Sequence, residues 1–206
     1  MTQEAQQQAG SAAPPQAIRL GTPAPVQVWK LKEPVFFVGF MGAGKTSVSR
    51  KMARQLGLAA VDMDTYIERQ QDCKVSDIFA RGGEELFRQI EAETLLELSQ
   101  PGRDPLLISC GGGVVVTERN RAILKEAGTV VFLKVSADEA KGRISDLSTR
   151  PLFNSVQDAR DRNAQRLPLY MEVADVVVDT AGKSVNAIAR EVRRALQERG
   201  VLWQPR

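Results

Sequence analysis

The chain has 206 residues, of which 43% are hydrophobic, and 28 Lys plus Arg against 25 Asp plus Glu give a formal net charge of +3. This composition supports a buried core and excludes a wholly disordered chain, and the length fits one domain with an appendage or two small domains. Histidine is absent, which excludes Ser-His-Asp triads, Cys-His dyads and His-containing metal sites.

The first 33 residues differ in composition from the rest, being rich in Gln, Ala and Pro. Such a stretch cannot bury enough apolar surface to offset its ordering entropy. We therefore expect residues 1–33 to form a disordered or loosely packed extension, in which only Val26 to Leu31 shows the alternation of a short strand. Residues 34–206 should form a single domain.

From Pro34 onward, apolar runs alternate with segments of helical periodicity. The pattern predicts strands over residues 35–38, 58–61, 106–109, 129–135 and 175–178. It predicts helices over 46–56, 65–71, 84–98, 117–127, 136–144, 160–170 and 185–196. Pro168 should end or kink its helix. Strands separated by helices imply a parallel sheet with right-handed crossovers.

The strongest motif follows the first strand, where residues 39–46 match the P-loop pattern GxxxxGK[ST]. Glycines in such a loop take positive φ values and bring backbone N–H groups onto phosphate oxygens at the start of the next helix. Lys45 adds a charge at the β and γ phosphates, and the Thr46 hydroxyl can coordinate Mg²⁺. The alternative is a glycine-rich turn with an incidental lysine, but the flanking strand and helix favour a phosphate site.

Two carboxylates, Asp62 and Asp64, follow the second strand. Ligands of open parallel sheets gather beyond the carboxyl ends of the strands, so both should lie on the phosphate side. In a chain without histidine, a carboxylate is the natural group to accept a hydroxyl proton. The alternative is structural, since Asp64 could cap the helix over residues 65–71.

The third strand ends in the consecutive glycines Gly111, Gly112 and Gly113. They indicate that another group approaches this backbone closely, or that it needs unusual φ values, although a sharp turn would also use glycine. Elsewhere in the chain, Arg88, Arg150 and Arg166 have the guanidinium groups that bind carboxylates and phosphates with two parallel hydrogen bonds. Each alone could equally be a solvated surface charge.

The remaining features concern location and partners. Cys73 and Cys110 form neither a CxxC pair nor a disulfide framework, which fits a reducing cytoplasm. No apolar run approaches the ~20 residues that span a bilayer, and no signal peptide is recognisable. The pI of about 9.0 is high, but the basic residues are dispersed among acids. We therefore expect neither membrane nor nucleic acid as a partner.

Together these motifs resemble the shikimate kinase family. The resemblance rests on the order GxxGxGKT, DxD, Phe-Arg, GGG, Arg-Pro-Leu and Arg-x-Pro-Leu-Tyr, which spans residues 34 to about 196. It implies a P-loop kinase fold of three layers, α/β/α, with a central, mostly five-stranded parallel sheet and a mobile lid over about residues 145–155. It also implies ATP-dependent phosphorylation of the 3-hydroxyl of shikimate, with Mg²⁺ as cofactor, by a monomeric cytoplasmic enzyme.

The resemblance carries family roles onto matching residues. Thr46 and Asp62 would hold Mg²⁺, while Lys45, Asp64 and Arg150 would be catalytic, Asp64 as the base and Arg150 from the lid. The ATP contacts would be Gly39, Met41, Gly42, Ala43, Gly44, Lys45, Thr46, Ser47, Arg143 and Arg150. The shikimate contacts would be Asp64, Phe79, Phe87, Arg88, Gly111, Gly112, Gly113 and Arg166.

Two other functions stay open at this point. Another small-metabolite kinase, such as gluconate kinase, shares the P-loop and overall order; the paired arginines and aspartates suit a cyclic triol bearing one carboxylate better. A non-catalytic nucleotide- or nucleic-acid-binding module is suggested by the basic final helix, yet the lysine, hydroxyl and acids of catalysis are all present. One departure from the family is the stretch 181–184, which lacks the proline often found in its adenine loop.

Overall fold

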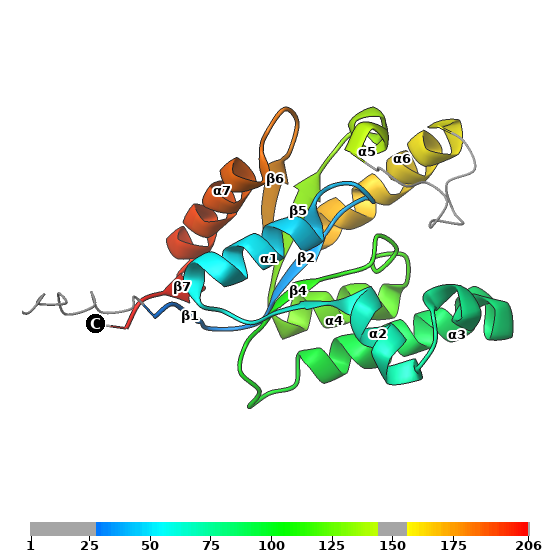
Figure 1. Cartoon of the computed structure of the whole chain (residues 1–206), viewed down its shortest axis with the longest axis horizontal. Helices are drawn as coiled ribbons and strands as arrows, with labels where there is room; N and C mark the ends of the chain where they lie inside the picture. Colours follow the sequence, from blue (N-terminus) through cyan, green and yellow to red (C-terminus); the bar gives the residue numbers. More distant parts are fainter. Residues whose placement is uncertain (1–27, 144–155, 206) are drawn as a thin grey trace, which may run out of the picture.

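The computed structural model describes residues 28–143 and 156–205, with the side chains of 141–143 and 156 left out. The strands are β1 (Lys30–Leu31), β2 (Val35–Val38), β3 (Ala60–Asp62), β4 (Leu107–Ser109), β5 (Thr129–Lys134), β6 (Val176–Asp179) and β7 (Leu202–Trp203). The helices are α1 (Lys45–Leu56), α2 (Met63–Gln71), α3 (Val75–Leu98), α4 (Glu118–Ala127), α5 (Ala137–Arg143), α6 (Val156–Val173) and α7 (Val185–Glu198) (Figure 1).

The centre of the molecule is a five-stranded sheet of order β3-β4-β2-β5-β6. All four neighbouring pairs are parallel, which confirms the predicted architecture. The strand order reverses direction at β2, since β4 and β3 extend to one side of it and β5 and β6 to the other. In open parallel sheets a ligand binds at such a switch point, beyond the carboxyl ends of the strands.

Each central strand packs on both faces because successive side chains point to opposite sides. In β2, Val35 and Phe37 belong to the core beneath α1 and α7, whereas Phe36 and Val38 belong to the core beneath α2, α3 and α4. In Figure 1, α1 and α7 accordingly lie together, apart from α2, α3 and α4. Among the described residues, no helix is both long and apolar enough to cross a membrane.

Two helices differ from the sequence prediction. The helix expected to start at Glu84 is the second part of α3, which begins at Val75 and is interrupted by Gly83 with φ 67° and ψ −163°. The helix predicted over 160–170 is longer at both ends, since α6 spans Val156–Val173 and continues past Pro168. Beyond Pro168, the buried ring of Tyr170 stacks on Phe132 of β5 with centroids 5.0 Å apart. This packing holds the last turn although Pro168 lacks an N–H donor.

The two ends of the described chain meet in a separate antiparallel ribbon, in which β1 pairs with β7 and Lys30 lies opposite Trp203. Trp29 and Leu31 are buried in the core beneath α1 and α7, and the Arg193 guanidinium lies 4.4 Å from the Trp29 ring centre. Residues 29–31, which the sequence analysis assigned to the extension, therefore pack against the domain. Residues 1–27 lie outside the described part.

Candidate active site

The P-loop connects the end of β2 to the start of α1. Gly39, Gly42 and Gly44 have φ values of 141°, 74° and 91°, which L side chains rarely adopt. A Cβ on Gly39 would lie 2.4 Å from the carbonyl oxygen of Leu133. The backbone conformation thus favours glycine at all three positions, as the motif predicts, and close packing adds to this at Gly39 and Gly42.

Lys45 is the first residue of α1 and extends back over its own loop. Its Nζ donates to the carbonyl oxygens of Gly39 at 2.8 Å and Phe40 at 3.1 Å. The ammonium therefore lies over the P-loop backbone at the N-terminus of α1, where phosphate oxygens would be held.

The Thr46 hydroxyl on α1 forms an oxygen cluster with side chains at the ends of β3 and β4. Its Oγ1 donates to Oδ2 of Asp62 at 2.7 Å and lies 3.0 Å from Oγ of Ser109. Burial would raise the pKa of Asp62, but hydrogen bonds from Thr46, Thr65 and Ser109 outweigh it and leave the pKa below its ordinary value. Asp62 is therefore ionised near neutral pH, and the cluster presents the hard oxygen donors that Mg²⁺ prefers.

Ser109 is a site residue that the sequence analysis did not single out. It ends β4, the strand between β2 and β3, so its hydroxyl reaches both Thr46 and Asp62. Its position at the carboxyl end of a central strand was the available signal. Across residues 28–143 and 156–205, no three acidic or cysteine side chains gather as a metal site of their own, so Mg²⁺ would depend on Thr46, Asp62 and ligands from the nucleotide.

The two aspartates of the DxD motif have different structural roles. Asp62 is the N-cap of α2 and accepts a hydrogen bond from the Thr65 amide at 3.1 Å. Asp64 lies inside the first turn of α2, so the capping alternative considered for Asp64 applies to Asp62 instead. Asp64 is exposed and borders the glycine segment, since a Cβ on Gly111 would lie 2.9 Å from its Oδ1.

Arg88 is held between two acidic residues of α3. Its Nη1 donates to Oε2 of buried Glu91 at 2.7 Å, and its Nε and Nη2 donate to Oε1 of Glu84 at 3.2 and 2.9 Å. The Arg88 guanidinium also lies 5.3 Å from the Phe87 ring centre. Phe87 in turn stacks on Phe79, with centroids 4.8 Å apart, so the two rings form one apolar surface beside Arg88.

The three glycines after β4 differ in what they contact. A Cβ on Gly113 would lie 2.4 Å from Nη2 of Arg88, which leaves no space for a side chain. A Cβ on Gly112 would meet Met41 N of the P-loop at 3.5 Å, an ordinary contact. None of these three glycines has a positive φ. Close approach, rather than unusual φ, is therefore the reason for glycine at Gly111 and Gly113.

Arg166 and Tyr170 reach the same segment from α6. Nη1 of Arg166 donates to the Gly112 carbonyl oxygen at 3.1 Å, and the Tyr170 hydroxyl donates to the same atom. Arg88 and Arg166 thus approach the glycine segment from different helices, and Gly112 places that segment against the P-loop. Among the described residues, the P-loop and the segment that Arg88 and Arg166 approach therefore lie next to each other.

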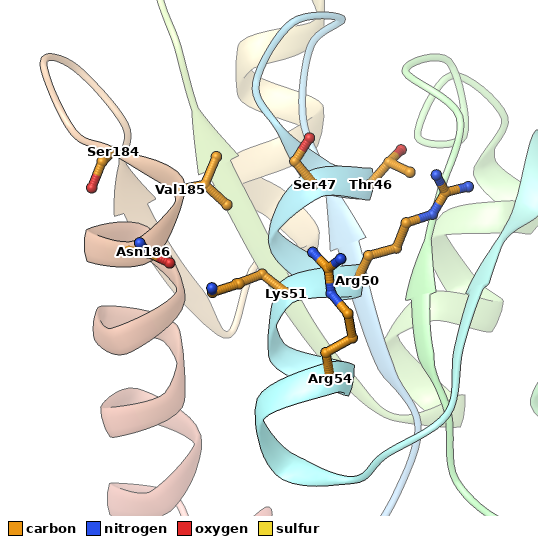
Figure 2. Close-up of a pocket in the computed structure, with 8 residues that line it drawn as sticks. All are labelled: Thr46, Ser47, Arg50, Lys51, Arg54, Ser184, Val185 and Asn186. Carbon is orange, nitrogen blue, oxygen red and sulfur yellow. The ribbon is translucent and has the colours of Figure 1, made fainter.

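A cavity of about 520 Å³ adjoins the P-loop on the side of α7. It extends between α1 and α7, as Figure 2 shows, and Thr46, Ser47, Arg50, Lys51, Arg54, Ser184, Val185 and Asn186 line it. Ser184 caps α7 through the Ala187 amide, so the end of the atypical stretch 181–184 borders this cavity. Three basic side chains on α1 make it favourable for anions.

Some predicted residues cannot be placed. The side chain of Arg143, the whole of Arg150 and the predicted lid over 145–155 lie outside the described residues. Their assigned roles stay predictions.

Comparison with known proteins identifies the family. A profile described as shikimate kinase matches residues 41–197. The shikimate kinase of Halorhodospira halophila is 41% identical over 82% of this chain and 96% of its own, and that of Dehalococcoides mccartyi is 34% identical over the same shares. A solved structure, shikimate kinase from Acinetobacter baumannii in complex with shikimate, superposes with a TM-score of 0.76 at 34% identity and covers 81% of this chain and 94% of its own. The chain belongs to the shikimate kinase family.

Proposed function

We propose that the protein transfers the γ-phosphoryl group of ATP to the 3-hydroxyl of shikimate. One observation carries the proposal: a P-loop lies directly against a glycine segment at which the carboxylate Asp64 and the guanidinium groups of Arg88 and Arg166 converge. That arrangement offers phosphate contacts, a base and cations for a substrate carboxylate within one site. The Acinetobacter relative, whose structure contains shikimate, supports the same substrate.

On the nucleotide side, the backbone N–H groups of residues 39–46 and Lys45 bind the β and γ phosphates. Thr46 and Asp62 would hold Mg²⁺, directly or through water. When bound, the ion neutralises charge that develops on the phosphates during transfer. The cavity between α1 and α7 lies beside Thr46 and Ser47, and its basic residues would attract the anionic nucleotide toward the loop.

On the acceptor side, Arg88 and Arg166 hold the shikimate carboxylate, and Asp64 takes the proton of the hydroxyl. The hydroxyl oxygen then bonds to the γ-phosphorus while the bond from that phosphorus to the bridging oxygen breaks. Shikimate 3-phosphate and ADP are the products. Phe79 and Phe87 form an apolar wall next to Arg88.

A gluconate kinase activity is the competing assignment. A gluconokinase from Sinorhizobium meliloti superposes with a TM-score of 0.53 but is only 17% identical, a likeness that shows the fold alone. The decisive experiment is ADP release with Mg²⁺-ATP and a panel of shikimate, gluconate and nucleoside monophosphates. Turnover with shikimate alone is expected, and turnover with gluconate in its place would overturn the proposal.

Two substitutions test the assigned roles. Lys45→Ala should lower turnover by roughly 100-fold or more, because the transferring phosphoryl group loses its nearest cation. Asp64→Asn should retain ATP binding and lose turnover by about 100-fold, the usual contribution of a positioned base. Near-normal turnover of Asp64→Asn would show that another group accepts the proton. The cytoplasmic location, the monomeric state and the lack of nucleic-acid affinity stay predictions.

A further inference from the structure

A buried amide outside the assigned site makes a contact that the proposed mechanism does not use. Asn120 lies in the first turn of α4 and has no exposed surface. Its Nδ2 donates to Oε2 of Glu91 on α3 at 3.0 Å. The same oxygen accepts the 2.7 Å hydrogen bond from Nη1 of Arg88. Asn120 is therefore joined to Arg88 through a single carboxylate oxygen.

The packing of α4 does not require an amide at this position. Ile123 and Leu124 already bury the apolar face of the helix, and no described group donates to the Asn120 Oδ1 atom. A buried acceptor without a donor destabilises the fold. An apolar side chain of similar size would avoid that cost, so the contact with Glu91 is what distinguishes Asn120 from leucine here.

Glu91 needs this second donor because its side chain is only 1% exposed. Burial raises the pKa of Glu91 and the nearby Asp64 charge adds to the effect, whereas Arg88 and the Asn120 amide lower it. Without Asn120 the Glu91 carboxyl group loses one of the two donors to its Oε2 atom, so its position is less well fixed and its contact with Arg88 weakens.

The Arg88 guanidinium has little space to move on the side that faces Gly113. Its Nη2 and Nη1 atoms would lie 2.4 and 2.8 Å from a Cβ on Gly113, so the guanidinium already touches the glycine backbone. Glu84, its other partner, is 62% exposed and offers weak restraint. The buried Glu91 contact therefore sets where the guanidinium lies.

We propose that Asn120 is a positioning residue for substrate binding, which fixes Glu91 and through it orients Arg88 toward the substrate carboxylate. The inference rests on the proposed function, in which Arg88 holds the shikimate carboxylate. It adds a residue from α4, which supplies no other side chain to the site as assigned above.

The test compares Asn120→Leu with Leu124→Ala, a matched substitution in the buried face of the same helix. Shikimate affinity is measured by calorimetric titration, steady-state kinetics give kcat and both KM values, and thermal unfolding reports stability. Asn120→Leu should raise the shikimate dissociation constant and KM about threefold to tenfold, while kcat and the KM for ATP change less than about twofold. Leu124→Ala should lower the melting temperature and leave shikimate affinity unchanged. Asn120→Ala provides the same affinity test if the leucine variant does not fold.

A double-mutant cycle with Arg88→Ala shows whether Asn120 acts through Arg88. In the Arg88→Ala background, Asn120→Leu should weaken shikimate binding no further. Equal effects in both backgrounds, or unchanged affinity of the folded Asn120 variants, would overturn the inference while the proposed function stands. Unchanged affinity of Arg88→Ala itself would instead overturn the proposed role of Arg88, and this inference with it.

Discussion

Gly113 and Gly112 are neighbours in sequence with very different surroundings. An added Cβ would overlap the Arg88 guanidinium at Gly113 but make an ordinary contact at Gly112. Gly113→Ala should therefore displace Arg88 and raise the shikimate dissociation constant by roughly tenfold, the loss of one charge-assisted hydrogen bond. Gly112→Ala is the comparison variant and should weaken shikimate binding much less, because the added Cβ does not meet Arg88. Equal affinities of the two variants, measured by calorimetric titration, would contradict this account.

Glu84 competes with the substrate for Arg88. Its Oε1 accepts from both Nε and Nη2 of Arg88, the pair of donors that would grip a carboxylate with two parallel bonds. Glu84 is exposed and lies one helical turn from Arg88, so the ion pair contributes only about 0.2–0.5 kcal/mol. Glu84→Gln should tighten shikimate binding by about twofold.

The control for this prediction is Glu85→Gln, which removes the same charge from an exposed neighbour. It should leave shikimate affinity unchanged. If Glu84→Gln weakens binding in the same titration, Glu84 assists the substrate rather than competing with it.

The single residues that could be predicted from the sequence are those whose conformation and contacts depend on their neighbours in the chain. The P-loop glycines, Lys45 and Thr46 follow from one contiguous motif, whose backbone conformation depends on the residues themselves. Ser109 and Glu91 could not be found in this way, because each acts across a contact between distant segments. Glu91 in particular has the sequence environment of an ordinary charged helix residue, and only the packing of α3 against α4 buries it.

Among the elements, the five central strands were predictable and the shape of α3 was not. The strands are short apolar runs bounded by turn residues, a pattern that depends little on tertiary context. The break in α3 depends on Gly83, whose positive φ separates two helical segments. In α6, the buried contacts of Tyr170 and Val173 outweigh the local effect of Pro168. These contacts involve distant segments of the chain, so the periodicity of the sequence does not predict them.

The ribbon of β1 and β7 should contribute measurably to stability. Trp29 is 7% exposed, and replacing a buried Trp with Ala costs about 3–5 kcal/mol. Trp29→Ala should therefore lower the free energy of unfolding in urea by about 3 kcal/mol. A chain that begins at Val28 keeps the ribbon and is the control; it should match the full chain. Unchanged stability of Trp29→Ala would show that the packing of Trp29 beside the ribbon is dispensable.

For the whole molecule, buried Tyr170 predicts a loss of stability in alkali. Burial raises the pKa of Tyr170 to about 12, whereas an unfolded tyrosine titrates near 10. The folded state therefore binds more protons between these values, and stability falls as the pH rises from about 10 to about 12, by roughly 2–3 kcal/mol. Below pH 10 this contribution is fully present.

The control for this pH dependence is Tyr170→Phe, which removes the titrating hydroxyl while Arg166 still donates to the Gly112 carbonyl. Urea unfolding at a series of pH values should show a shallower alkaline decline for the variant than for the parent chain. Parallel declines would mean that other groups govern alkaline unfolding.

The pairing of Lys30 with Trp203 also brings the beginning and the end of the described chain side by side. A short linker from Gln204 to Val28 would close the backbone into a ring, and the exposed turn at Gly102 offers a place to open it. Such a circular permutant would keep every strand neighbour while reordering the sequence. The parallel sheet would then be synthesised starting from β4 and ending with β3, and the P-loop would follow β4, β5 and β6 instead of preceding them.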